Sequence, residues 1–339
     1  MSITVLAPGA LSTLQDPGRH GSRHLGVGQA GALDVWSHRI ANLLVGNAAD
    51  AVTLEITLTG PTLRFDAGAR IALTGAQLDA RVDGRPLPCW TLLALPAGSV
   101  LRLGRCHDGA RSHLAVAGGF AVPPVLGSRA TDLRGGFGGL GGRALQAGDR
   151  LETGTLPVAD RNDVLRAAAW WVDAHADLDD ALPDPACVRV LPGDDAPAMR
   201  EVLGAAWRVS ASSNRQGLRL EGPARGLAQR DDRVSAPVFP GTVQLPPDGR
   251  PIVLLADAQT HGGYPVLGHV IRADLPRLAQ RRPGAPLRLV ACTQAEAAAA
   301  ACVQRHRLAR IASAIAARYA SDPFAPLRVR GTPQPQARP

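Results

Sequence analysis

The run VTLEITLTGPTLRFDAGARIALTG, residues 52–75, points most directly to the fold class of this chain. Apolar and polar residues alternate along it, and Gly or Pro interrupts the alternation at intervals of roughly ten residues. This pattern is typical of half-buried strands in an antiparallel sandwich or barrel. It continues to residue 119 and returns over residues 187–292. A mainly β protein with a few helices is therefore predicted.

The remaining segments divide the chain into two β domains and their connections. An alanine-rich run near the C-terminus favours a helix, because alanine has the highest helix propensity. The final residues, rich in Pro, Gln and Arg, favour disorder. The predicted units are an N-terminal β-barrel domain (1–155), a helical linker (156–185), a C-terminal β-barrel domain (186–295), a helix (296–320) and a disordered tail (321–339).

Composition excludes several classes of function. The net charge is +8, but all 37 basic residues are Arg and only 4% of residues are aromatic, so the basic stripe with stacking rings of a nucleic-acid binder is not expected. The absence of lysine excludes a Schiff base and a Walker-type phosphate site on this chain. Five scattered cysteines without a C-x-x-C motif argue against disulfides and zinc. Neither a spanning segment nor a secretory signal is recognised, which predicts a cytoplasmic protein without membrane partners.

A candidate site lies in GTVQLPPDGRPIVLLADAQTHGGYPVLGHVIRADLPRLAQ, residues 241–280. An apolar strand there runs into a glycine-containing turn crowded with polar groups. Rigid elements commonly deliver side chains to such loops. The polar residues concerned are Gln244, Asp257, Gln259, Thr260, His261 and Tyr264. The alternative is a hairpin with a polar tip.

Two other segments carry candidate residues. Asn214 and Arg215 precede an alternating strand, where an amide and a guanidinium could read a carboxylate; the alternative is an Asx turn beside a surface arginine. The glycine-rich segment 15–34 is expected to be a long surface loop before a helix of period 3.6. Its G-x-G-x-x-G lacks a preceding strand and is not a dinucleotide fingerprint, but an anion at the helix N-terminus near Arg19 or Arg23 stays open.

Six ordered motifs together carry a family resemblance. They are QDPGRHGSRHLGVGQAGALD with ANLLVGN, LEITLTGP, TDLRGGFGGLGGRALQAGD, SNRQGLRLEGP, and the stretch from GTVQLPPDG to GHV. In this order they resemble the family of the 5-oxoprolinase C subunit, also called the biotin-dependent carboxyltransferase-like family, which includes allophanate hydrolase subunit 2 and Kip-antagonist proteins. The chain departs from the family at Val266, where relatives often read GGYPK. That lysine either carries charge chemistry that this chain lacks or is a surface residue.

The resemblance implies a fold and a function. The implied fold is two cyclophilin-like β-barrel domains in pseudo-symmetric arrangement. The implied activity is ATP-dependent opening of the lactam of 5-oxo-L-proline to L-glutamate. Its partners would be the 5-oxoprolinase B subunit, of Kip-inhibitor type, and the A subunit, of lactam-utilisation type, with ATP bound in the complex and not necessarily on this chain. The alternatives are biotin-dependent carboxyl transfer, with biotin as the cofactor, and a non-catalytic regulatory partner of a Kip-inhibitor-type protein.

Opening a lactam needs donors aimed at a developing oxyanion and a group that manages protons. We therefore predict catalytic roles for Asp257, Tyr264, Arg215 and Asn214. Predicted contacts to the substrate are Gln244, Gln259, Gly262, Gly263, Arg19, Asp16 and Asp34, with no metal. The underlying hypothesis is that the Asn214–Arg215 corner and the corner containing Asp257, Gln244 and Tyr264 face one shared cleft.

Overall fold

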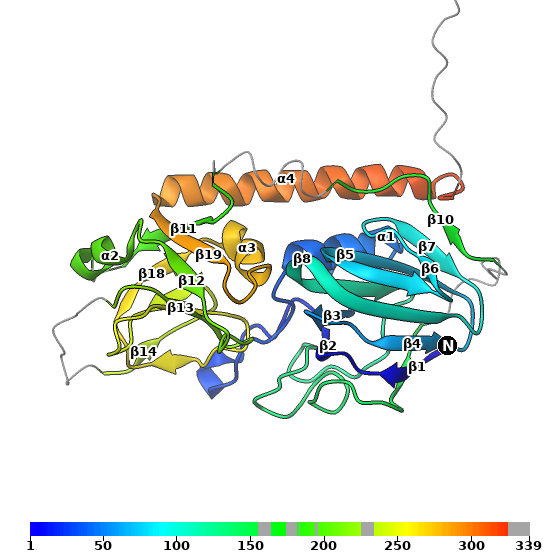
Figure 1. The fold of residues 1–339 in the computed structure, drawn as a ribbon, viewed down its shortest axis with the longest axis horizontal. Helices are drawn as coiled ribbons and strands as arrows, with labels where there is room; N and C mark the ends of the chain where they lie inside the picture. The colour runs from blue at the N-terminus through cyan, green and yellow to red at the C-terminus, as the bar shows by residue number, and fades with distance from the viewer. Residues whose placement is uncertain (155–163, 174–181, 183, 194–195, 225–233, 325–339) are drawn as a thin grey trace, which may run out of the picture.

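The computed structural model consists of two β halves that lie side by side beneath one long helix, α4 (Figure 1). The described residues are 1–154, 164–173, 182, 184–193, 196–224 and 234–324, without the side chains of 196–198. Within them, no helix combines the length and the apolar character needed to cross a membrane. The prediction of a mainly β fold is confirmed.

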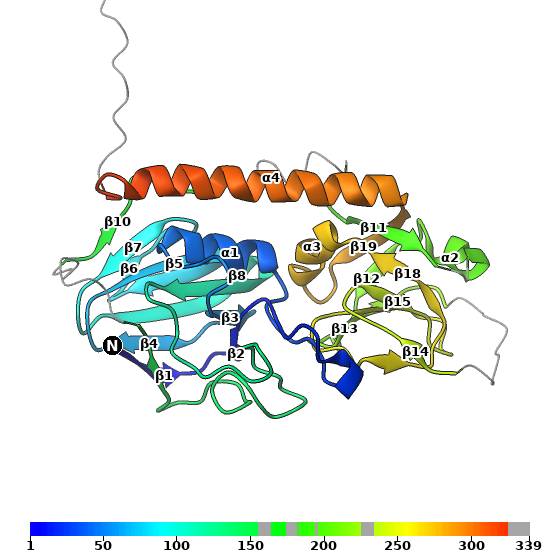
Figure 2. The ribbon, with the colours of Figure 1, turned by 180° about the vertical axis from the view of Figure 1, so that it is seen from behind.

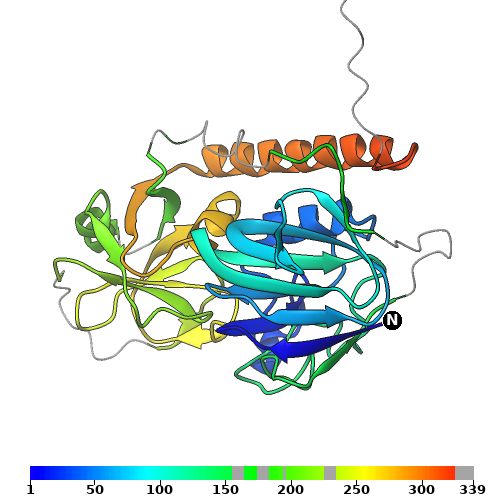
Figure 3. The same cartoon turned by 45° about the vertical axis from the view of Figure 1, so that its right-hand side comes forward.

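The N-terminal half is a ten-stranded sheet in the order β10-β7-β5-β8-β4-β1-β9, with β2 on β3, β3 on β8 and β6 on β5. Figure 3 shows these strands running beneath α4. Its strands are β1 (Ser2–Ala7), β2 (Leu11–Gln15), β3 (Thr53–Thr57), β4 (Thr62–Phe65), β5 (Ala69–Val82), β6 (Arg85–Pro86), β7 (Leu92–Leu95), β8 (Val100–Val116), β9 (Arg150–Glu152) and β10 (Arg166–Ala167). The long antiparallel pair β5–β8 extends from Ile71 opposite Val116 to Val82 opposite Leu101. Alternate apolar residues of these strands, such as Leu63 and Phe65 of β4, form one buried core.

The C-terminal half is a closed barrel in the order β11-β18-β15-β16-β13-β12-β19, so its strands leave no open edge. The barrel strands are β11 (Cys187–Pro192), β12 (Trp207–Val209), β13 (Gly217–Glu221), β15 (Thr242–Gln244), β16 (Ile252–Leu254), β18 (Val266–Val270) and β19 (Pro286–Ala291). Only β11 and β19 pair in parallel among these described strands. Outside the barrel lie β14 (Ala236–Pro237), β17 (His261–Gly262), η3 (Arg272–Asp274), α2 (Ala196–Val202) and α3 (Leu275–Ala279). Trp207 is fully buried in the barrel core.

Two helices cover the halves. Helix α1 (Val35–Leu44) begins where the Asp34 side chain accepts hydrogen bonds from the N–H and hydroxyl of Ser37, at 3.0 and 2.7 Å. Helix α4 (Gln294–Tyr319) begins with a capping box between Thr293 and Glu296. It passes over both halves, as Figure 2 also shows, and near its end the Tyr319 hydroxyl donates to the Leu44 carbonyl at 2.8 Å.

The structure differs from the sequence interpretation in the linker and the tail. The helix predicted within 156–185 is wrong for the described residues 164–173, which include the short strand β10 on the edge of the N-terminal sheet. Trp170 explains the difference, because it is buried and its indole N–H donates to Pro323 O at 2.8 Å. Phe324 is buried in the same cluster, so residues 321–324 are not disordered. Residues 325–339 lie outside the described residues, and the domain limits stay predictions.

Candidate functional site

The candidate site lies at the seam between the halves, where the segment 16–34 leaves the N-terminal sheet and packs on the barrel (Figure 2). Ala30 N donates to Ala256 O at 3.0 Å, and the side chain of Leu33 joins the barrel core. The Arg23 guanidinium donates to the carbonyls of Val238 and Thr260. The segment therefore connects the two halves, and its middle, residues 24–26, is exposed as expected of a surface loop.

Arg215 is the centre of this seam. It lies in the turn before β13 and donates through Nε and Nη2 to the two carboxylate oxygens of Asp257, each at 2.9 Å. Its Nη1 pairs with Glu55 of β3, and its Nη2 also donates to Gly31 O at 2.7 Å. The side chains of Arg215, Glu55 and Asp257 are only 3%, 1% and 3% exposed. One buried guanidinium thus joins carboxylates from both halves of the molecule.

The two carboxylates differ in proton affinity. Burial raises the pKa of Asp257 above the ordinary aspartate value, and the opposing effect of Arg215 does not cancel it. Burial also pushes the pKa of Glu55 upward, but the charges around it, chiefly that of Arg215, outweigh burial and lower that pKa. Glu55 is therefore the fixed anion of the group. Asp257 is the carboxyl group that takes up a proton more readily.

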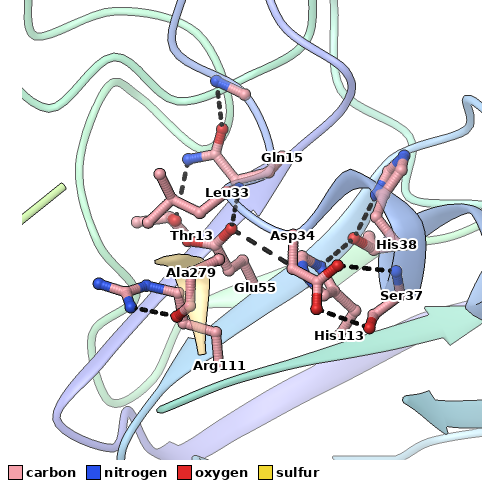
Figure 4. A network of polar contacts seen from close by, with 12 residues as sticks. Thr13, Gln15, Leu33, Asp34, Ser37, His38, Glu55, Arg111, His113 and Ala279 are labelled. Atoms are coloured by element: carbon pink, nitrogen blue, oxygen red, sulfur yellow. Dashed lines mark hydrogen bonds and ion pairs between the residues drawn. The ribbon is translucent and has the colours of Figure 1, made fainter. Parts of the chain in front are cut away.

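A row of polar side chains extends from Glu55 along the N-terminal half (Figure 4). Glu55 Oε2 accepts from Leu33 N at 2.7 Å, and His113 Nε2 lies 4.0 Å from the same oxygen. The Thr53 hydroxyl contacts Nδ1 of both His113, at 3.1 Å, and His38, at 2.9 Å. Burial lowers the pKa of both histidines, which keeps them neutral at pH 7. The polar face of β3 is thus buried and hydrogen-bonded.

Gln280 forms a second connection between the halves. Its Nε2 donates to Asp34 at 2.6 Å and to Arg111 O at 2.9 Å, and its Oε1 accepts from the backbone N–H groups of Ala110 and Arg111. The Arg111 guanidinium in turn donates to Ala279 O (Figure 4). Asp34, predicted to contact substrate, caps α1 and holds Gln280 instead.

Asp16 and Arg19 hold the glycine-rich loop that follows β8. Asp16 accepts from the Ser128 hydroxyl at 2.7 Å and from Arg129 N at 2.6 Å. Arg19 is fully buried, donates to carbonyls of residues 125 and 130, and lies 4.7 Å from the ring centroid of Phe137. Both side chains are therefore buried and hold the loop in place.

The other predicted residues separate into two places. Asn214 is exposed and accepts from Gln216 N at 2.8 Å, which is the Asx turn of the alternative interpretation; its neighbour Arg215 is buried. Gln244 pairs with Ile252 at the start of β16, whereas Asp257 follows the end of that strand. The two predicted corners meet only through Arg215 and Asp257.

Two of the remaining candidates, Gly262 and Tyr264, lie beside Gln244. Its amide donates weakly to Tyr264 O at 3.4 Å, and a Cβ on Gly262 would lie 2.6 Å from it. Tyr264 is 46% exposed, Gly263 is exposed and Gln259 is half-buried. Val266, the departure from the family pattern, is partly buried against a small apolar cluster that includes Val238.

A cavity of 760 Å³ adjoins the seam. Ala30, Ala32 and Leu33, which flank or follow the Gly31 carbonyl held by Arg215, form part of its wall. The barrel contributes the segment 269–272 and the start of α3, and α4 covers the cavity. None of the residues predicted from the sequence lines it. The buried network therefore supports the cavity wall without facing the cavity.

Sequence reasoning missed Glu55, Arg111, His113 and Gln280. Each stands alone in an ordinary strand or helix pattern, and only their meeting at the seam distinguishes them. Among the described residues, no three His, Cys, Asp or Glu side chains gather as a metal site would require.

The fold and the seam define a protein of two β units, one a closed barrel, joined by buried ion pairs. The chain belongs to the family described as carboxyltransferase domain, subdomain A and B, whose model matches residues 25–291. It is 42% identical over 297 residues to the C subunit of 5-oxoprolinase from Escherichia coli (strain K12), a match that covers 87% of this chain and 93% of the relative. The corresponding protein of Haemophilus influenzae is 35% identical over 87% of this chain and 93% of its own length.

Larger proteins contain the same unit. The crystal structure of the K. lactis urea amidolyase superposes with a TM-score of 0.80 at 28% identity, over 91% of this chain. The chain spans only 20% of that structure's length. The unit therefore occurs both as a separate polypeptide and as part of a multidomain enzyme.

Proposed function

We propose that this chain is the C subunit of an ATP-dependent 5-oxoprolinase complex, which opens the lactam of 5-oxo-L-proline to L-glutamate together with the A and B subunits. The observation that carries the proposal is the 42% identity to the E. coli protein over 93% of that relative. By contrast, the matched part is only 16% of the yeast urea amidolyase. A match that covers nearly all of a separate subunit favours the same role here.

The seam suggests how this chain contributes. The donors Nε, Nη1 and Nη2 of Arg215 are all engaged by Asp257, Glu55 and Gly31, so we assign Arg215 the role of a positioning residue. Both oxygens of Asp257 accept from Arg215, and Asp257 does not line the cavity, so we assign it a positioning role as well. Tyr264 is exposed enough to touch a ligand or the B subunit. Asn214, on the surface beside Arg215, is assigned to contacts within the complex.

ATP would supply the driving force for opening a stable amide, and we place it on another polypeptide of the complex. Mg²⁺ that accompanies ATP requires oxygen ligands, usually including carboxylates. The described lining of the cavity has a single carboxylate, Asp50, and it is paired with Arg39 at 2.8 Å. The chain also lacks the lysine of a Walker-type loop. These residues do not fit a Mg²⁺–ATP site.

Reconstitution tests the proposal. The A and B subunits are mixed with this chain, and glutamate release from 5-oxo-L-proline is measured with ATP present and with each component omitted. We expect turnover only when all three chains and ATP are present. Full turnover without this chain would contradict the proposal, and tight pairing with the B subunit in the absence of turnover would favour the regulatory role.

Variants separate the assigned roles. We expect Asp257→Asn to lower kcat and Tyr264→Phe to raise KM, with Gln146→Met, an exposed residue far from the seam in sequence, as the control. Unchanged kinetics for Asp257→Asn would remove its role.

Biotin-dependent carboxyl transfer is the second candidate, favoured by the TM-score of 0.80 with the urea amidolyase. It predicts that the isolated chain binds free biotin or a biotinylated carrier domain. Isothermal titration with both ligands distinguishes it from the first candidate, which expects no biotin binding.

A further inference from the structure

One face of helix α4 covers the cavity beside the seam. Seven residues of α4 line it: Gln294, Ala297, Ala298, Ala301, Gln304, Arg305 and Leu308. Their spacing of three and four places them on one face of the helix. Three of them are alanines, and such short side chains leave space between α4 and the layer beneath. That layer includes Leu33, Trp36 and Leu275.

Two arginines at this cavity have no counter-charge. Gln304 Nε2 donates to Ala273 O at 3.3 Å, which brings α4 against η3. Arg305 follows Gln304 and Arg272 precedes Ala273, so the two arginines flank this bond, and both line the cavity. No carboxylate of the described residues forms an ion pair with either guanidinium, whereas the guanidinium groups of Arg189 and Arg215 are paired. Two guanidinium groups that line one cavity and have no carboxylate partner favour a bound anion.

The rest of the cavity is suited to an apolar group. Leu33 and Trp36 are buried at 6% and 5% exposure, whereas Arg272 and Arg305 are exposed. The wall therefore changes from apolar inside to cationic at the solvent side. A ligand with a compact apolar body and one terminal negative charge matches both ends.

We propose that this cavity binds a small organic carboxylate, with its carboxylate between Arg272 and Arg305 and its apolar body under the alanines of α4. If the chain acts as proposed above, 5-oxo-L-proline is the ligand, since it combines a small ring with one carboxylate. That identification rests on the proposed function. The carboxylate site itself rests on the cavity and its two arginines.

Isothermal titration of the full isolated chain tests the site. The probes are 5-oxo-L-proline, its uncharged counterpart 2-pyrrolidinone, and cyclopentanecarboxylate, which keeps the charge and loses the lactam. We expect the two carboxylates to bind at least tenfold more tightly than 2-pyrrolidinone, a difference of about 1.4 kcal/mol. Equal affinity for the neutral lactam, or no binding of either carboxylate, would overturn the proposal.

Matched variants locate the site. We expect Arg272→Gln with Arg305→Gln to weaken carboxylate binding at least tenfold, whereas Arg310→Gln, an exposed arginine of α4 outside the cavity, changes it less than twofold. Ala301→Phe should block the cavity, while Ala309→Phe on the exposed side should not. Circular dichroism confirms folding of each variant. Binding that survives both Ala301→Phe and the double arginine variant would contradict the proposal.

The outcomes separate this inference from the proposed function. Binding of cyclopentanecarboxylate but not 5-oxo-L-proline, with the same sensitivity to the variants, supports the carboxylate site and contradicts the choice of ligand. Turnover in the reconstituted complex that the double arginine variant leaves unchanged supports the function and contradicts this cavity as the substrate site.

Discussion

Arg215 and Glu55 stand 160 residues apart in the chain and form an ion pair at the centre of the molecule. Glu55 belongs to the N-terminal sheet and Arg215 to the barrel, so the pair connects the two halves directly. Asp257 completes the group from the barrel side. Two buried carboxylates thus depend on one guanidinium, and the seam cannot open without exposing or separating charges.

Removal of this guanidinium should destabilise the protein strongly. Arg215→Met leaves Glu55 and Asp257 buried without their partner, and we expect a loss of about 3–5 kcal/mol in the free energy of unfolding. Arg81→Gln breaks a pair with Asp79 in which both side chains are about half exposed, so its cost should stay below about 1 kcal/mol. Urea unfolding measures both. Similar values for the two variants would show that the buried pair does not hold the seam.

Stability should fall as the pH drops below 6.5. Burial lowers the folded-state pKa values of His38 and His113. Below pH 6.5 the unfolded chain therefore binds more protons at these two side chains than the folded chain does. Stability is then greatest above pH 6.5 and decreases by up to about 1.4 kcal/mol per pH unit for each histidine. Below pH 4.5 the lowered pKa of Glu55 adds a further loss, which the raised pKa of Asp257 partly offsets.

Histidine variants check this pH dependence. Urea unfolding at pH 7.5 and 5.5 should give a smaller difference for His38→Asn with His113→Asn than for the native chain. The exposed His107→Asn serves as the control and should keep the native difference. An unchanged slope in the double variant would show that other groups cause the acid instability.

Gln280 should be indispensable for the second connection. Gln280→Met keeps the volume but leaves the N–H groups of Ala110 and Arg111 without acceptors and removes a donor from Asp34. We expect a loss of about 2–5 kcal/mol, since each unsatisfied buried group costs about 1–3 kcal/mol. The exposed Gln146→Met should change stability by less than about 0.5 kcal/mol. Thermal unfolding of both variants measures the two changes in stability.

Two glycines of the loop beside Arg19 should respond differently to alanine. Gly141 and Gly142 both have positive φ, at 65° and 72°, so alanine costs about 1–2 kcal/mol of backbone strain at either position. A Cβ at Gly142 would also lie 2.0 Å from Gly136 C, whereas one at Gly141 meets open space. Gly142→Ala should therefore lower the melting temperature far more than Gly141→Ala. Equal shifts would mean that the loop can relax.

The predicted residues had mixed outcomes for physical reasons. The ends of the strands were visible as polar clusters, which is why Asp257 and Arg215 were found. Their burial was not visible, because a guanidinium in a turn looks the same in sequence whether it faces water or a second domain. Asn214 forms the local Asx turn that its own sequence favours, since that contact involves only Gln216. Catalytic roles for these residues stay predictions.

Alternation, turn residues and capping patterns are local properties, and they were sufficient to predict a mainly β chain, the helix after Asp34 and the long helix α4. Contacts between distant segments are not local. The burial of Glu55, the bond from Gln280 to Asp34 and the cavity under α4 arise only when two separately formed β units are pressed together. No local sequence pattern indicates which polar residues become buried at that contact, because their burial depends only on how the two units pack against each other.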